Sequence, residues 1–133
     1  MPPRPSRFAL YNWFPEDGAD LVHPDDLAAF AAMGPPATVF GVGADAAGWV
    51  LLDAGQASFR VRADLLRPLP APRYWVGDTV RFIKSGVPQR GIVARVGWHF
   101  KEAAPMYYVS QDGKRLKKTY HEQDLSPINA ESP

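Results

Sequence analysis

The stretch from residue 75 to residue 110 constrains the fold of this chain more than any other. It runs WVGDTVRFIKSGVPQRGIVARVGWHFKEAAPMYYVS, with β-branched and aromatic residues between glycine and proline breakers. Val80 and Phe82 share one face of an alternating segment, which is typical of a half-buried strand. The pattern predicts a turn-rich loop at Ser85–Gln89 and three strands, at Thr79–Lys84, Arg90–Phe100 and Met106–Ser110.

Shorter elements are predicted on both sides of that stretch. His23–Gly34 is typical of a helix, because Pro24 suits the first helical position and Gly34 suits a left-handed C-terminal cap. Ala63–Leu69 is typical of one helical turn that a proline ends. Weak alternation predicts a short strand at Arg7–Trp13, three short strands are predicted at Ala37–Val42, Gly48–Asp53 and Ser58–Arg62, and a basic strand is predicted at Leu116–His121.

Two segments of the chain are similar to each other at a spacing of 59 residues. WVLLDAGQASFRVRADLLRPL, residues 49–69, aligns without a gap on YVSQDGKRLKKTYHEQDLSPI, residues 108–128, so that Pro68 matches Pro127. Each copy has the pattern of a hairpin, a strand, one helical turn and a proline. One structural unit that occurs twice explains this pattern, and chance similarity of two hairpins is the alternative.

Four short motifs mark the second half of the chain: Val76–Arg81, Gly91–Val93, Tyr107–Val109, and Asp124-Leu125 before Pro127. Through these motifs the chain resembles the SH3-like small-barrel superfamily, of the Tudor and KOW type. The resemblance covers residues 74–128, with 37–70 as a shorter copy, and it implies strongly bent strands that close a barrel. Such barrels bind peptides, methylated side chains, RNA or DNA. The whole chain, with its NWFPEDG and HPDDL segments, also resembles a group of small bacterial proteins, and this brings no activity with it.

We therefore expect a mainly β protein made of two tandem SH3-like small β-barrel modules with one N-terminal α-helix. Residues 1–36 are expected to form a strand, a loop and a helix packed on the first module. The short module is expected at 37–70, the fuller module at 74–128, and a disordered tail at 129–133.

Composition limits the class of protein. The 133 residues are 46% hydrophobic and 22% charged, which is ordinary for a folded domain. No apolar run has the length of a membrane span, no signal peptide is apparent and cysteine is absent, so we expect a cytoplasmic protein. Residues 1–70 carry 5 Lys/Arg and 8 Asp/Glu, whereas residues 71–133 carry 10 and 6. A basic second half can attract an acidic partner.

The leading hypothesis is a non-enzymatic protein-binding module, of an adaptor or immunity type. Neighbouring residues on a strand point to opposite faces, so Trp98 and His99 cannot both be core residues, and neither can Tyr107 and Tyr108. At least two of these four side chains are expected to be exposed or covered by the other module. The alternative is that the aromatic residues fill the barrel and pack between the modules. The candidate contact residues are Trp13, Trp98, His99, Tyr108 and Val87.

The second hypothesis is nucleic-acid binding by the basic half of the chain. Its candidate residues are Arg81, Arg95, Arg115, Lys117 and Lys118, with Lys84 and Arg90 on the earlier strands. If these cations share a face, they would contact phosphates and give salt-sensitive binding. The alternative is that they keep an exposed hairpin edge from pairing with other chains.

The least favoured hypothesis is a zinc-dependent hydrolase at His23–Asp26. This segment resembles the HPDD motif of zinc-dependent sugar N-deacetylases, in which His and Asp bind the metal. Those enzymes have a glutamate where this chain has Leu27, and a helix start already explains Pro24, Asp25 and Asp26. The sequence also has no phosphate-binding glycine loop and no nucleophile elbow. We expect no catalytic activity, no metal and no cofactor.

Overall fold

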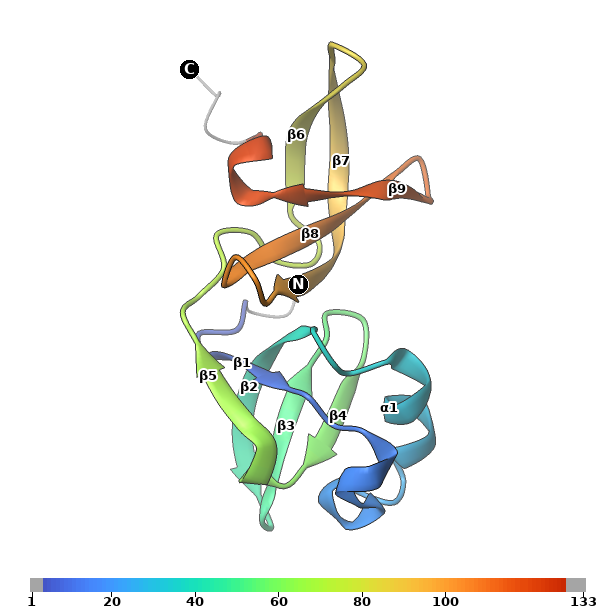
Figure 1. The fold of residues 1–133 in the computed structure, drawn as a ribbon, viewed down its shortest axis with the longest axis vertical. Coiled ribbons are helices and arrows are strands. Elements are labelled where there is room, and N and C mark those ends of the chain that lie inside the picture. Colours follow the sequence, from blue (N-terminus) through green and yellow to red (C-terminus); the bar gives the residue numbers. More distant parts are fainter. Residues whose placement is uncertain (1–3, 129–133) are drawn as a thin grey trace. The chain divides into compact units, whose positions relative to one another are not determined.

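A computed structural model describes residues 4–128, apart from the side chains of residues 45 and 46. The protein is mainly β, with two five-stranded antiparallel sheets and one α-helix (Figure 1). The chain divides into two compact units, Met1–Ala71 and Pro72–Pro133, and each unit holds one sheet. The tail expected at 129–133 lies outside the described residues. Within the described part of the chain, no helix combines the length and the apolar character needed to cross a bilayer.

The first sheet has the strand order β4-β3-β2-β1-β5. Its strands are β1 (Phe8–Tyr11), β2 (Val39–Ala46), β3 (Trp49–Asp53), β4 (Ser58–Val61) and β5 (Leu66–Leu69). β1 pairs with β2 on one side and β5 on the other, and all four of its residues are buried. The N-terminal strand is thus a central strand of the first sheet, rather than an element packed against a module that begins at residue 37.

The segment predicted as one helical turn, Ala63–Leu69, has two parts. Ala63–Leu65 forms the 3₁₀ turn η3, and Leu66–Leu69 then continues as the strand β5. Pro68 is tolerated in this strand because β5 is at the edge of the sheet, where one row of backbone donors needs no partner strand.

The helix α1 (Leu27–Met33) is shorter than predicted, and the 3₁₀ turns η1 (Pro15–Asp17) and η2 (Ala19–Leu21) precede it. Gly34 ends the helix in the left-handed conformation, as predicted. At the other end, residues 24–26 form a turn in which the Asp26 carboxylate accepts hydrogen bonds from the backbone N–H and Nε of Arg60, at 2.8 and 2.9 Å. The buried Phe30 of α1 packs at centroid distances of 5.0–6.0 Å against the rings of Tyr11, Trp13, Phe40 and Phe59.

The second sheet has the strand order β10-β6-β7-β8-β9. Its strands are β6 (Thr79–Lys84), β7 (Val87–His99), β8 (Ala104–Gln111), β9 (Lys114–His121) and β10 (Ser126–Pro127). Ser85 and Gly86 turn the β6–β7 hairpin with φ angles of 52° and 79°, as a two-residue hairpin turn requires. The loop predicted at Ser85–Gln89 therefore has only two residues outside the strands, and Val87 already belongs to β7.

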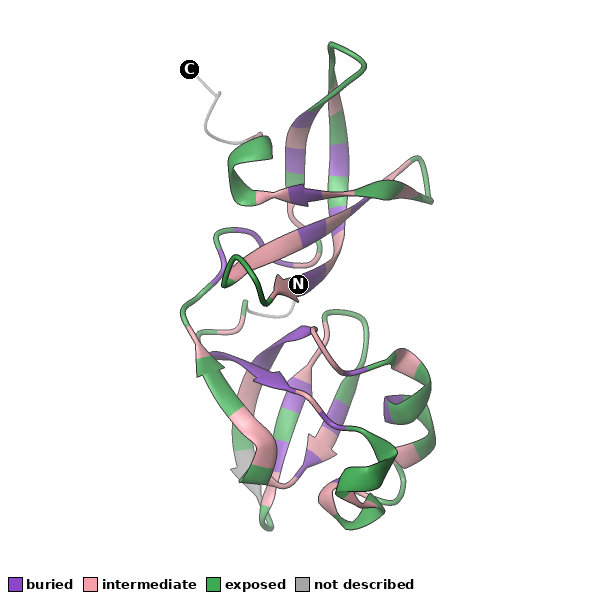
Figure 2. Cartoon of the chain, viewed as in Figure 1, coloured by how far each residue is buried: buried purple, intermediate pink, exposed green. Residues whose placement is uncertain are grey.

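The long strand β7 joins two parts of the second sheet. It pairs with β6 over Val87–Ile92 and with β8 over Ile92–His99, with a bulge between Val93 and Arg95. A bulge bends a strand, and Figure 1 shows β8 and β9 crossing the direction of β6 and β7. Buried residues alternate with more exposed ones along much of these strands (Figure 2), and the buried ones include Val80, Phe82, Val93, Val96, Tyr107 and Val109.

The two sheets repeat one arrangement. Starting from β4 in the first sheet and from β9 in the second, both sheets have the same order: the fourth, third, second and first strands of the unit, and then its fifth. The first strand of each unit therefore pairs with its last. η3 precedes β5, and the 3₁₀ turn η4 (Glu122–Asp124) precedes β10. Pro68 pairs with Ala9 in the first sheet, and Pro127 pairs with Val80 in the second. The predicted repeat thus corresponds to equivalent elements. Each sheet is open, with β4 and β5 as the edges of the first and β9 and β10 as the edges of the second.

Candidate functional site

The strands β6, β7, β8 and β9 are strongly basic. These four described strands contain eight Lys and Arg residues and no Asp or Glu. One face of the sheet carries the buried core, so side chains that alternate with the core residues lie on the other face. We call that other face the basic face and define it by Arg81, Arg90, Arg95, Tyr108, Arg115 and Lys117.

The strand registers bring these residues together. Arg81 on β6 lies directly opposite Arg90 on β7, and Arg95 on β7 lies opposite Tyr108 on β8. On β9, Arg115 lies opposite Ser110 and Thr119 lies opposite Tyr108; the register shifts between these two pairs, and Lys117 lies midway between Arg115 and Thr119, which are both on this face. Four of the five cations named for nucleic-acid binding therefore share one face, and Arg90 joins them.

Tyr108 lies between two arginines of the basic face, Arg95 and Arg115, at the end of the face away from Arg81 and Arg90. The Cζ atom of Arg115 is 4.5 Å from the centroid of the Tyr108 ring, and that of Arg95 is 6.0 Å from it. These distances allow cation–π attraction between the guanidinium groups and the ring. The pKa of Arg95 is lowered, chiefly because the side chain is partly buried and also because of the positive charge of Arg115.

A shallow groove lies beside Arg81 and Arg90. Pro88 and Gln89 complete its lining, and its volume is about 330 Å³. Arg81 and Arg90 lie directly opposite each other on neighbouring strands, so two positive charges line this groove. The groove therefore carries the positive charge that attracts a phosphate group.

Lys118 does not belong to the basic face. Its Nζ atom lies 5.1 Å from the ring centroid of Tyr120, whose ring packs against the buried Phe82 at 5.1 Å. Because residues i and i+2 of a strand share a face, Lys118 extends over the core side of the sheet. Its sequence neighbour Lys117 is on the opposite side, so only one of the two is a candidate contact on the basic face.

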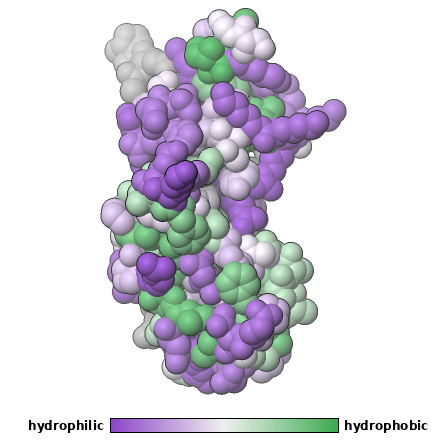
Figure 3. All heavy atoms as spheres, in the orientation of Figure 1, coloured by the Kyte–Doolittle hydropathy of each residue, from purple (hydrophilic) through white to green (hydrophobic). Residues whose placement is uncertain are grey.

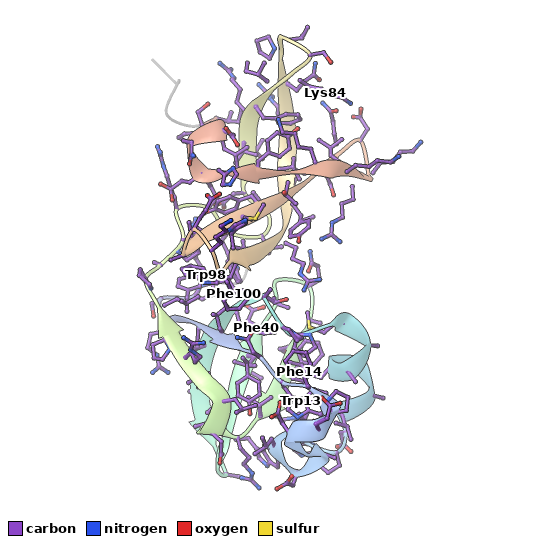
Figure 4. All side chains as sticks on the ribbon, in the orientation of Figure 1. Trp13, Phe14, Phe40, Lys84, Trp98 and Phe100 are labelled. Atoms are coloured by element: carbon purple, nitrogen blue, oxygen red, sulfur yellow. The ribbon has the colours of Figure 1, made fainter. Side chains whose placement is uncertain are left out.

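The residues named for protein binding lie in different surroundings. Trp13 is a core residue, 4% exposed, and its indole N–H donates to the carbonyl of Gly18 at 2.9 Å. Figure 4 shows it beside α1. Because Trp13 is buried against Phe30, it cannot contact a partner and is not a candidate contact residue. Val87 is exposed, and Trp98, His99 and Tyr108 are partly exposed.

The alternation expected of the two aromatic pairs is found at one of them. Tyr107 is fully buried and Tyr108 is not, as neighbours on a strand require. Burial raises the pKa of Tyr107 to about 12. Trp98 and His99 are both partly exposed, because they lie at the end of the β7–β8 hairpin opposite Pro105 and Ala104.

His99 and His121 form a small polar cluster with two carboxylates. The two rings lie 6.4 Å apart, His121 Nε2 lies 3.2 Å from Glu102 Oε1, and His121 Nδ1 lies 3.5 Å from Asp124 Oδ2. The N–H of Glu102 donates to His99 Nδ1. The cluster connects the β7–β8 turn to η4. Among the described residues, no three His, Asp or Glu side chains are placed to hold a metal ion.

The HPDD segment is held by the fold of the first unit. Besides its two bonds from Arg60 noted above, the Asp26 carboxylate accepts a third at 3.2 Å, and the pKa of Asp26 is lowered chiefly by these bonds. His23 Nδ1 accepts the N–H of Asp25 at 3.1 Å, and its ring packs on Trp49 with centroids 5.0 Å apart. The segment thus ties the start of α1 to β4.

A family model matches residues 1–126, which include both sheets up to the first residue of β10. The chain belongs to a family of unknown function, DUF6960. No curated protein and no solved structure matches the chain. The family match therefore extends over the basic face as well as the core of the first unit.

Proposed function

We propose that each unit is an SH3-like small barrel in an open form. Support comes from the shared order of five strands, the pairing of the first strand with the last, and the 3₁₀ turn before the last strand. The bulged, thirteen-residue strand β7 also supports it, because it takes part in both halves of a strongly bent sheet. In the first unit, η1, η2 and α1 occupy the connection between the first two strands.

We further propose that the protein is a non-enzymatic binding protein whose second unit binds nucleic acid through the basic face. The observation that carries this is the gathering of Arg81, Arg90, Arg95, Arg115 and Lys117 on one face of strands that hold no carboxylate. Arginine and lysine side chains on a sheet contact phosphate oxygens, and binding gains free energy from release of the counterions around the nucleic acid.

This function predicts a particular salt dependence. Five phosphate contacts to a single strand give a plot of log K against log salt concentration with a slope of about −3.5. A protein held by apolar contacts alone has a slope near zero. The slope therefore reports how many of the cations on the basic face take part.

The test is fluorescence anisotropy of a labelled oligonucleotide titrated with the full chain from about 50 to 200 mM salt, the range over which such contacts change affinity strongly. The double variant Arg81→Glu/Arg90→Glu is expected to lose most of the binding. Arg67→Glu, which changes an exposed cation on β5 of the first unit, is the matched control and should bind as the wild type does. Absence of binding by the wild type at low salt would reject the proposal.

A second candidate function, binding of another protein, is favoured by exposed apolar side chains at the tip of the β6–β7 hairpin. Ile83 is 55% exposed and Val87 is 53% exposed, and Lys84 lies beside them (Figure 4). Figure 3 shows hydrophobic atoms at this tip amid a hydrophilic surface. A pull-down with the full chain tests it, with Val87→Asp and Trp98→Ala as variants. A partner retained by the wild type and by both variants would show that these residues do not bind it.

A further inference from the structure

We propose that the ligand of the basic face is single-stranded nucleic acid and that Tyr108 is the platform on which an unpaired base stacks. This rests on the function proposed above and names the class of nucleic acid and the residue that selects it. The cations supply affinity for any polyanion, whereas the aromatic ring between Arg95 and Arg115 adds a contact that only an accessible base can make.

The position of Tyr108 is suited to stacking. Its neighbour Tyr107 is fully buried in the core, so the backbone of β8 holds the ring of Tyr108 on the opposite face. Arg95 and Arg115 place their guanidinium groups 6.0 and 4.5 Å from the ring centroid. Planar guanidinium groups also stack on bases, so β7, β8 and β9 each contribute one planar group next to the others.

The location of the ring within the sheet argues against a duplex. The major groove admits a helix or a two-stranded ribbon, and bases inside a duplex expose only their edges there. Tyr108 belongs to β8, which is paired on both sides by β7 and β9, and so the ring lies on a broad sheet face that cannot enter a groove. Unpaired bases have free π-faces and can turn toward such a surface.

Arg81 on β6 and Arg90 on β7 give the single-stranded nucleic acid a second point of contact. Arg81 and Arg90 line the shallow groove on β6 and β7, and Arg115 and Lys117 lie on β9. Arg90 and Arg95 are five residues apart on β7, which is about 16 Å along an extended strand. A short single-stranded nucleic acid laid along β7 would thus place a phosphate at Arg81 and Arg90, pass Arg115, and place a base on Tyr108 at the other end.

The experiment compares three ligands of equal length with the full chain: an oligothymidylate, an abasic strand with the same phosphates, and a duplex. A length of about 12 nucleotides is within the range covered by small single-strand-binding modules. We expect the oligothymidylate to bind at least about 5-fold more tightly than the abasic strand, since one stacked base contributes that much or more. The duplex is expected to bind no better than the abasic strand.

Variants at Tyr108 separate stacking from charge. Tyr108→Leu keeps an apolar side chain on the strand but removes the ring, and is expected to weaken binding of the oligothymidylate about 5- to 150-fold. Its affinity for the abasic strand should stay as in the wild type, which also shows that the variant is folded. Tyr108→Phe keeps the ring and should restore the preference for bases.

Two outcomes would overturn the inference, and they differ from the outcome that would overturn the proposed function. Equal binding of the oligothymidylate and the abasic strand would show that the basic face recognises phosphates alone. Tighter binding of the duplex would point to the projecting β6–β7 ribbon as the contact in place of Tyr108. In both cases nucleic-acid binding itself stands, whereas failure of the wild type to bind any of the three ligands removes the proposed function as well.

Discussion

Lys117 and Lys118 are adjacent on β9 but lie on opposite faces of the second sheet. Lys118 extends toward Tyr120 on the core side, and Lys117 shares the basic face with Arg115. The two positions therefore allow the same change of charge to be made on each face in turn.

Lys117→Gln is expected to weaken nucleic-acid binding and to reduce the salt slope by about one unit, because one phosphate contact is lost. Lys118→Gln removes the same charge from the other face and is expected to leave the slope as in the wild type. Anisotropy titrations at several salt concentrations measure both. Equal losses in the two variants would show that net charge, and not the basic face, determines binding.

Gly91→Ala is expected to destabilise the second unit by about 1–3 kcal/mol, because overpacking forces neighbouring atoms apart. A Cβ atom at this position would lie 2.5 Å from Val109 Cγ1 and 2.9 Å from the carbonyl oxygen of Ser110. Ile92→Ala is the control: that side chain is 50% exposed, and its loss should change the free energy of unfolding by about 0.5 kcal/mol or less. Urea denaturation followed by circular dichroism measures both variants.

Asp26→Asn is expected to reduce the dependence of stability on acidic pH. The pKa of Asp26 is lowered in the folded protein, mainly by its hydrogen bonds from Arg60. A carboxyl with a lowered pKa contributes stability at pH values above its unfolded pKa of 3.8, and that contribution disappears as the pH falls through the folded value. The melting temperature between pH 6 and pH 2 is the measurement. Asp25→Asn, at a side chain that is 78% exposed, should retain the wild-type profile, and an unchanged profile in Asp26→Asn would contradict this role.

Trp13→Ala is expected to destabilise the first unit by about 3–5 kcal/mol, because the indole is buried against Phe30 and the cavity left behind cannot close. Phe14→Ala, at the next residue, removes a side chain that is 50% exposed and should have a much smaller effect. Chemical denaturation of the two variants measures the difference. A stable, fully folded Trp13→Ala protein would return Trp13 to the set of surface candidates.

Local patterns in the sequence predicted the strands well, and they failed where contacts between distant segments decide. The alternation at Tyr107 and Tyr108 and the left-handed cap at Gly34 are confirmed, because both depend only on the neighbouring backbone. The predicted start of the helix at His23 was wrong: α1 begins at Leu27, and Arg60 on β4 binds Asp26 in the turn before it. Trp13 was also assigned to the surface, because a lone aromatic residue after a short strand gives no sign of which core it enters.

The basic face shows most clearly the difference between what local sequence patterns predict and what contacts between distant segments decide. Period-two alternation from the buried Val93 would place Arg95 in the core and Val96 outside, whereas the bulge after Val93 places Val96 in the core and Arg95 opposite Tyr108. The sequence by itself determined most of the strands, though not β5 and β10, together with the repeat and the excess of cations in the second half, because these follow from residue types and their spacing along the chain. Only the tertiary structure decided which cations share a face, because register and bulges are set by the packing of both paired strands at once.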